Sequence, residues 1–220
     1  VKKISDVYSD EATLETIKAM ADGIPIIHSA PVMNEQNKTY GIIDLLVRSD
    51  FINKIFKEKV LTTKEEHHGC AFSPNYHYRV IDIKFSTLPI RADGKHILNS
   101  GHYKAYKSQL YIYNKAIGRF QKYTPGEAYI LGRKYGYESK GVKYRGTSCL
   151  DKAGVIDFNG IDGDVESNTK DAIQWILKLR TEGKDWTYTT NPELYPNLKH
   201  ESVYQPEKIK VAETLGDITQ

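Results

Sequence analysis

The sequence has few cysteines and no long apolar run. Its two cysteines, Cys70 and Cys149, lie far apart and neither belongs to a Cys-x-x-Cys pair. This pattern argues against a disulfide scaffold and predicts free thiols in a reducing compartment. No stretch of about 18 apolar residues occurs and no signal-peptide pattern opens the chain, so we expect an intracellular protein without a membrane span.

The overall charge is weak, which limits what composition can say about partners. The formal net charge of the 220 residues is +3 and the isoelectric point is near 8.6. This balance is compatible with a polyanionic partner such as DNA but does not identify one. The length predicts a single domain over residues 1–220. Because the chain starts with Val1, we expect it to be part of a longer polypeptide with further domains or partner proteins.

Two apolar segments each carry an acidic residue where a buried strand is expected. Asp44 lies in the segment 41–48, and Asp82 lies in the segment 78–86 together with Lys84. Residues two apart in a strand share a face, so Asp82 and Lys84 point the same way, and we expect Ile83 to point to the core. A carboxylate in an apolar strand is costly unless it is paired or binds a metal ion. Two such carboxylates on neighbouring strands predict a site for Mg²⁺ or a similar hard cation.

Lys84 adds a positive charge beside the expected cation. A lysine in this position can hydrogen-bond an attacking water, or it can balance the charge that grows on a phosphorane-like transition state. Asp44, Asp82 and Lys84 together provide the functional groups needed for hydrolysis of a phosphodiester bond.

A polar pair on the next predicted helix belongs to the same cluster. The segment 103–117 has the apolar spacing of a helix, and we expect it to end at Gly118. Gln109 and Tyr113 are four residues apart and therefore share one helix face. Gln109 can orient Lys84 or a substrate phosphate, and Tyr113 can support the same cluster.

These three motifs, in this order, resemble the RecB-like branch of the PD-(D/E)XK nuclease superfamily, whose pattern is a G-x-x-D strand, a D-x-K strand and a Q-x-x-x-Y helix. The resemblance covers about residues 10–133, and about 134–220 would be a C-terminal extension. It implies a restriction-endonuclease-like α/β (α+β) fold with a central mixed sheet flanked by helices. It also implies a metal-dependent DNase in which Asp44, Asp82 and the main-chain carbonyl of Ile83 bind Mg²⁺ or Mn²⁺. Lys84 would be the catalytic base or stabiliser.

The chain departs from some members of this family. Two cysteines cannot hold the four-thiolate iron–sulfur cluster that some RecB-like nucleases contain. Relatives often supply a further acid or histidine from the opening helix region. Glu11, Glu15 and His28 are the candidates, and their spacing does not separate them.

Further elements are expected along the chain. They are a helix that ends near 21, a strand at 24–32 paired with the Asp44 strand, a short helix at 50–56, a strand at 128–133, a helix at 166–180 and a tail from 191 that wraps loosely or connects to another part. The loops 57–75 and 88–100 flank the predicted site. Both carry basic residues, which either approach a phosphate backbone or are simply solvated.

Three other patterns have a functional and a structural interpretation. The residues 133–145 interleave lysine, arginine and tyrosine, which predicts either stacking on single-stranded bases or an ordinary exposed hairpin. Zinc binding by His67, His68 and Cys70 is disfavoured because no fourth ligand completes the set. Four aspartates between 151 and 164 can be imagined as a second metal site, but their glycine-rich surroundings favour turns.

Two alternatives to a DNase remain open. The chain can be a nucleic-acid-binding module without cleavage, although two buried carboxylates are unfavourable where the phosphates of DNA must approach. The same core can act on RNA, because no residue is identified that must sense a 2′-hydroxyl. The sequence does not decide between an exonuclease and an endonuclease, and it does not predict the strand polarity.

Overall fold

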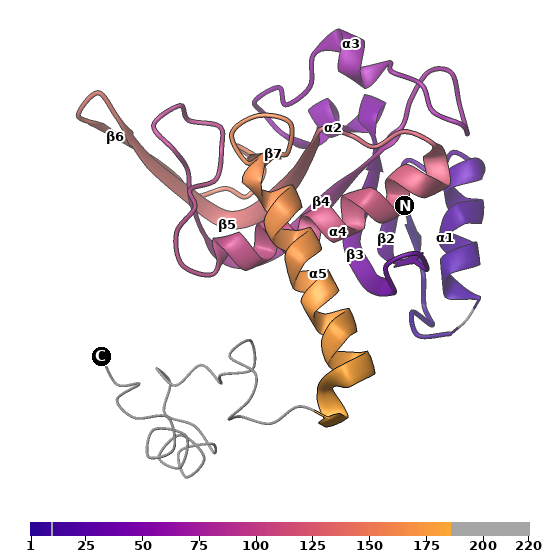
Figure 1. The fold of residues 1–220 in the computed structure, drawn as a ribbon. Coiled ribbons are helices and arrows are strands. Elements are labelled where there is room, and N and C mark those ends of the chain that lie inside the picture. Colours follow the sequence, from indigo (N-terminus) through magenta and orange to yellow (C-terminus); the bar gives the residue numbers. More distant parts are fainter. Residues whose placement is uncertain (10, 186–220) are drawn as a thin grey trace, which may run out of the picture. The chain divides into compact units, whose positions relative to one another are not determined.

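The computed structural model describes residues 1–9 and 11–185. In these residues seven strands form one mixed sheet, accompanied by five α-helices and a short 3-10 helix (Figure 1). The predicted class, a mixed α/β fold with a central sheet and flanking helices, is confirmed.

The strands follow one path, with the last strand added at the side. In sheet order they are β1 (Lys2–Lys3), β2 (Ile26–Asn34), β3 (Thr39–Arg48), β4 (Tyr78–Pro89), β5 (Glu127–Ser139) and β6 (Val142–Gly146). The strand β7 (Gly154–Asp157) pairs with the first residues of β5. The pairs β1–β2 and β4–β5 are parallel, and the others are antiparallel. The predicted hairpin of β2 and β3 is therefore present.

The helices are α1 (Ala12–Ala21), α2 (Ser49–Ile55), α3 (Thr63–Glu66), α4 (Tyr103–Gln121) and α5 (Asp164–Glu182), with the 3-10 turn at Gly183–Asp185. The predicted end of the fourth helix at Gly118 is wrong. This helix continues to Gln121 and is followed by Lys122 in a left-handed conformation with a φ of 55°. Gly118 is needed for packing, because a Cβ atom there would collide with the side chain of Thr124.

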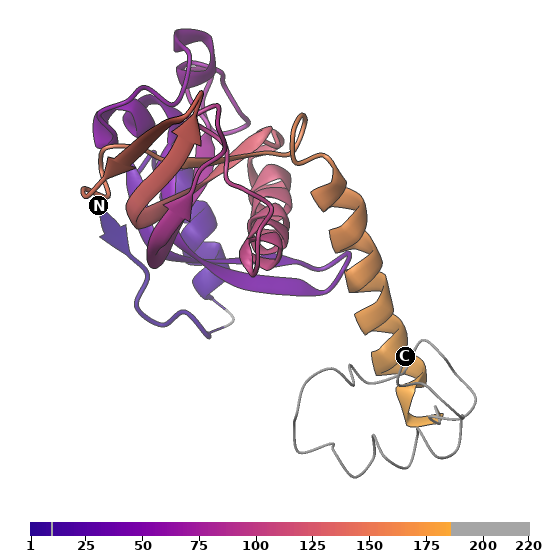
Figure 2. The same ribbon diagram turned by 90° about the vertical axis from the view of Figure 1, so that its left-hand side faces the viewer.

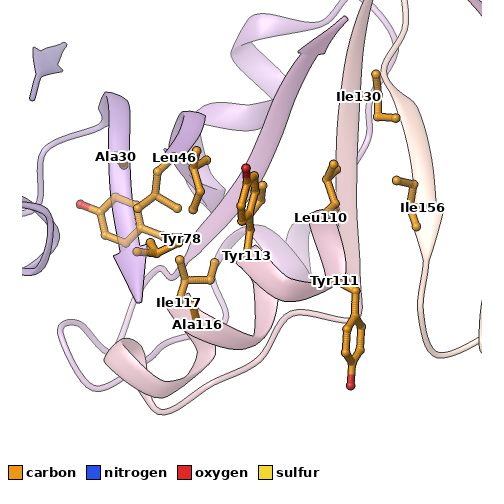
Figure 3. Close-up of a cluster of buried hydrophobic side chains, with 14 of the residues drawn as sticks. Ala30, Leu46, Tyr78, Leu110, Tyr111, Tyr113, Ala116, Ile117, Ile130 and Ile156 are labelled. Atoms are coloured by element: carbon orange, nitrogen blue, oxygen red, sulfur yellow. The ribbon is translucent and has the colours of Figure 1, made fainter. Parts of the chain in front are cut away.

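Two apolar cores lie on opposite faces of the sheet. The larger one includes residues of α1 and α4, and Figure 3 shows Leu110, Tyr113 and Ile117 of α4 near strand residues such as Leu46 and Tyr78. In the view of Figure 2, α4 lies against one side of the strands. The smaller core lies under α2 and includes Val47, Ile52, Ile81 and Tyr129. Thus β4 contributes alternate residues to the two cores.

The chain divides into two units, with the boundary after Lys170, inside α5. The first unit, Val1–Lys170, contains the sheet; of the second, the structure describes residues 171–185. The single domain expected over 1–220 stays a prediction, and the tail expected from 191 lies outside the described residues. The core boundary expected near 133 falls within β5, because that strand runs to Ser139. Among residues 1–9 and 11–185, none of the helices is both long and apolar enough to cross a membrane.

Candidate active site

The two predicted carboxylates lie where β3 and β4 separate. The antiparallel pairing of these strands runs from Arg48 and Tyr78 to Leu45 and Ile81, and it stops there. The next residues on the two strands are Asp44 and Asp82. The side chain of Asp44 takes over the role of a strand partner, since its Oδ2 accepts a hydrogen bond of 2.7 Å from the main-chain N–H of Ile83. Among residues 1–9 and 11–185, no strand pairs with the edge of β4 that faces β3 from Asp82 onward.

The ladder between β2 and β3 is also interrupted at Asp44. His28 pairs with Leu45 and Ala30 pairs with Ile43, but Ser29 and Asp44 between them are unpaired. Ser29 has a φ of 55°, a left-handed conformation that non-glycine residues seldom adopt and that is often found near functional sites. As a result Leu46 and Ile43, three residues apart, pack in the same core, which a regular strand does not allow. Asp44 therefore sits at a local break in the sheet.

Asp82 and Lys84 form a partly buried ion pair. Asp82 is only 2% exposed, and its Oδ2 lies 2.7 Å from Nζ of Lys84. Burial raises the pKa of the Asp82 carboxyl, Lys84 opposes this shift, and the carboxylate of Asp44 raises the pKa further. Oδ2 of Asp82 is thus held in an ion pair with Lys84 and accepts no further hydrogen bond. A divalent cation at Asp82 would share this carboxylate with the Lys84 ammonium.

Residues of α4 complete a continuous set of contacts. Lys84 Nζ donates a hydrogen bond of 3.3 Å to Oε1 of Gln109, and Nε2 of Gln109 donates one of 2.8 Å to the hydroxyl of Tyr113. Lys84 Nζ also lies 4.4 Å from the ring centroid of Tyr106. Burial raises the pKa of Tyr113, so this residue is a neutral phenol at physiological pH. Gly41 of β3 leaves room for the Tyr113 ring, because a Cβ atom there would overlap it.

The residue types present fit a small divalent cation. Mg²⁺ is usually held by one or two carboxylates and retains several waters, so it does not need a complete protein cage. The carboxylates of Asp44 and Asp82 meet this minimum, although Oδ2 of Asp82 already has Lys84 as an ion-pair partner. In the described part of the chain, no group of three or more His, Cys, Asp or Glu side chains is arranged to hold a metal ion. A cation here would therefore rely on these two carboxylates, main-chain oxygen and water.

The candidates for a further ligand do not complete such a group. Glu15 on α1 forms an ion pair of 2.9 Å with Lys2. His28 lies on β2 between Lys3 and Leu45. Glu11 directly precedes α1. None of the three belongs to a metal-binding group with Asp44 and Asp82 in the residues described.

The other predicted patterns have different roles in the structure. His68 stacks on Tyr123 with ring centroids 4.2 Å apart, and the main chain of Cys70 pairs with Ser73. The ring of Tyr137 on β5 stacks on Tyr144 of β6 at 4.7 Å, with 10° between the ring planes. The hairpin of β5 and β6 is extended in Figure 1. Because its tyrosines stack on one another, the contacts support the structural interpretation of this hairpin.

The aspartates before α5 also have partners. Asp151 pairs with Lys57, and Asp162 pairs with Lys107 of α4 in a contact of 2.5 Å between two fully buried side chains. Lys107 donates further hydrogen bonds to the carbonyl of Ile97 and to Asn99. This buried pair was missed by sequence reasoning, although a lysine on the apolar face of a helix is a signal that could have indicated it.

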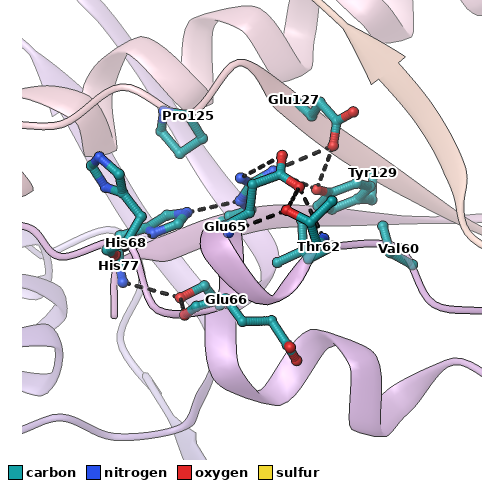
Figure 4. Close-up of polar contacts among 12 residues, drawn as sticks. Val60, Thr62, Glu65, Glu66, His68, His77, Pro125, Glu127 and Tyr129 are labelled. Atoms are coloured by element: carbon teal, nitrogen blue, oxygen red, sulfur yellow. Dashed lines mark hydrogen bonds and ion pairs between the residues drawn. The ribbon is translucent and has the colours of Figure 1, made fainter. Parts of the chain in front are cut away.

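A second buried polar network lies on the opposite face of β4. Figure 4 shows part of it, around Glu65, His77, Glu127 and Tyr129. Its centre is Arg79, which is 2% exposed. The sequence analysis did not single out Arg79, although this residue also interrupts an apolar strand.

Comparison with known proteins does not assign the chain to a family. A scan against protein-family models and a search among curated proteins both gave no match. The resemblance to RecB-like nucleases therefore stays a prediction that rests on the three motifs.

Proposed function

We propose that the chain is a Mg²⁺- or Mn²⁺-dependent nuclease that hydrolyses phosphodiester bonds in DNA. The main support is the convergence of residues that are remote in sequence. Asp82, Lys84, Gln109 and Tyr113 form one series of contacts, and the carboxylate of Asp44 bonds to the main chain of Ile83 within it. Within this series, the buried Oδ2 of Asp82 has the Lys84 ammonium as its ion-pair partner and accepts no further hydrogen bond.

Each residue has a distinct role in this proposal. Asp44, Asp82 and the main-chain carbonyl of Ile83 would hold the metal ion, which supplies a Lewis acid and lowers the pKa of a bound water. Lys84 donates a hydrogen bond to the attacking water or to a phosphate oxygen, and its charge offsets the negative charge of the transition state. Gln109 fixes the position of Nζ through its Oε1, and the hydroxyl of Tyr113 holds the amide of Gln109 in place.

A cleavage assay on end-labelled single-stranded and double-stranded DNA, with RNA as a third substrate, tests the proposal. We expect cutting that requires Mg²⁺ or Mn²⁺ and that is lost in Asp82→Ala and Lys84→Ala. Glu35→Gln is a matched control, since Glu35 is an exposed carboxylate in the turn between β2 and β3. Failure to cut with either metal, or equal cutting by both variants, would rule out the nuclease.

Metal binding can be measured apart from catalysis. A ligand that binds only the folded state raises the melting temperature, and the stabilisation grows with the logarithm of one plus the ratio of the ligand concentration to Kd. We expect Mn²⁺ to raise the melting temperature of the wild type and of Glu35→Gln, but not that of Asp82→Ala. DNA binding without cleavage and without this shift would support the alternative of a silent binding module.

A further inference from the structure

An apolar groove lies beside the candidate site, on the other face of β4. Its volume is about 390 Å³. The residues that line it come from β4, β5 and the loop after β6: Ile83, Lys84, Phe85, Leu131, Gly132, Arg133, Thr147, Ser148 and Cys149. Ile83 and Phe85 alternate along β4 with Asp82 and Lys84, so the groove and the carboxylate cluster share one short segment of strand.

The groove exposes an aromatic ring and a cation together. Phe85 is 85% exposed and Ile83 is 45% exposed, although both are large apolar residues. The guanidinium carbon of Arg133 lies 4.8 Å from the centroid of the Phe85 ring. The two apolar side chains are neighbours on the same face of β4 and line one groove, so their exposed surface is contiguous. An aromatic ring combined with arginine is the surface on which unpaired nucleobases stack while their phosphates are neutralised.

The groove is continuous with the candidate site through Ile83. The N–H of Ile83 bonds to Asp44, while its side chain lines the groove. Because β3 no longer pairs with β4 beyond Ile81, no strand in the described part of the chain separates the groove from the candidate site at this edge. A chain that lies in the groove can therefore continue to Lys84 without crossing the sheet.

We infer that this groove binds single-stranded DNA, with an unpaired base stacked on Phe85 and the adjoining phosphates near Arg133 and Lys84. The inference rests on the proposed function, because only that function says that a phosphodiester bond of the bound strand is cut. Duplex DNA does not fit this mode of binding, because the faces of its bases are already stacked on one another. The guanidinium of Arg133 beside Phe85 favours a polyanion over an apolar protein segment in the same groove.

Fluorescence anisotropy with a short labelled oligonucleotide tests the inference, with EDTA present so that no cleavage occurs. We expect the wild type to bind the single strand more tightly than the matching duplex. Phe85→Ala should weaken single-strand binding roughly 10-fold, within the range found for stacking aromatics, and Phe85→Trp should retain it. Because Phe85 is largely exposed, neither change should affect folding. Tyr144→Ala is the aromatic control, since Tyr144 is 43% exposed on the hairpin outside the groove, and its affinity should be unchanged.

Three results would overturn the inference: equal binding of single strand and duplex, unchanged affinity of Phe85→Ala, or an equal loss in Tyr144→Ala. A single-stranded RNA that binds more tightly than the DNA would overturn the choice of DNA. The outcome is separate from that of the cleavage assay, because binding is measured without metal. Binding that depends on Phe85, together with no metal-dependent cutting, would refute the nuclease and leave the groove as a binding site.

Discussion

Two charged clusters lie three residues apart on β4, on opposite faces of the sheet, and they differ in how well their polar atoms are satisfied. Arg79 donates hydrogen bonds to His77 Nε2 at 2.8 Å, to the Tyr129 hydroxyl at 2.6 Å and to Glu127 at 3.3 Å. Nη2 of Arg79 also lies 3.7 Å from Oε1 of Glu65. Asp82 is equally buried but has a single ion-pair partner, Lys84, and the neighbouring carboxylate of Asp44 raises its pKa.

This difference separates a structural network from a candidate active site. A buried cation surrounded by acceptors holds the strands and loops around it in one arrangement, and nothing remains for a ligand to bind. A buried carboxylate next to a like charge is unfavourable by itself and becomes favourable when a cation arrives. The irregular strand pairing is also found at the candidate active site rather than at the Arg79 network. The breaks in the β2–β3 and β3–β4 ladders lie at Asp44, and the pairing of β4 with β5 shifts register after Lys84.

The largest expected effect follows from neutralising the unsatisfied cluster. Asp82→Asn keeps the shape of the side chain and removes its charge, so we expect cleavage to fall by roughly 10³-fold or more, on the scale of a lost electrostatic contact in a transition state. Stability should change little, because the repulsion with Asp44 disappears together with the ion pair with Lys84. Single-turnover cleavage rates and urea denaturation measure the two effects. Strong destabilisation of Asp82→Asn would place Asp82 in the structural class with Arg79.

The opposite pattern is expected for the satisfied cluster. Arg79→Met removes the cation and leaves the carboxylate of Glu127 without its buried partner, so we expect the free energy of unfolding to fall by about 3–5 kcal/mol. The cleavage rate per folded molecule should change little, because the side chain lies on the face away from Lys84. Lys64→Met, at an exposed position of α3, is the control for loss of a positive charge. A fall of less than about 1 kcal/mol in Arg79→Met would contradict the structural role.

His77 makes the satisfied cluster sensitive to acid. Arg79 donates to Nε2, so Nδ1 carries the proton and donates to the carbonyl of His68, and a protonated ring would oppose the guanidinium. Burial lowers the pKa of His77 to about 4. Below pH ~6.5 the histidine of the unfolded chain binds a proton, whereas His77 of the folded chain binds one only below about pH 4. The free energy of unfolding should therefore fall as the pH falls from about 6.5 to about 4.

The contribution of His77 can be isolated by substitution. It is at most about 3–4 kcal/mol, since each unit of pKa difference corresponds to about 1.4 kcal/mol. His77→Gln keeps one acceptor and one donor without a titrating group, so its stability should depend less on pH. Urea denaturation of both proteins between pH 4 and 7 gives the comparison. Parallel curves for the two proteins would show that His77 is not the group responsible.

The sequence predicted which residues of the candidate site lie together better than it predicted the backbone and exposed side chains around them. Asp82, Lys84, Gln109 and Tyr113 follow from strand and helix periodicity, and their contacts in the structure match the expected faces. The strained Ser29 opposite Asp44 could not be predicted, because it depends on how three strands meet. The exposure of Phe85 could not be predicted either, since the pattern of an aromatic residue next to a buried strand segment is typical of a core residue.

The charged residues with structural roles were harder to interpret. Arg79 and Lys107 have the same signature in sequence as Asp82, a charge within an apolar pattern. What distinguishes them is the partners that the fold supplies, and these come from distant segments: Glu127 on β5 and Asp162 after β7. The end of α4 was misplaced for a similar reason, because the need for glycine at 118 arises from a contact with Thr124.

The smallest effects are expected where the candidate site is best satisfied, on α4. Gln109→Ala removes the acceptor that orients Lys84, and we expect kcat to fall roughly 10-fold, the scale of a hydrogen bond to a charged group. Tyr113→Phe removes only the hydroxyl that holds the amide of Gln109, so the fall should be roughly 3-fold or less, at the low end for a neutral hydrogen bond. Steady-state kinetics on labelled DNA, with melting temperatures to confirm folding, would rank the two. If Tyr113→Phe were as inactive as Lys84→Ala, the hydroxyl would have to act directly on the substrate rather than through Gln109.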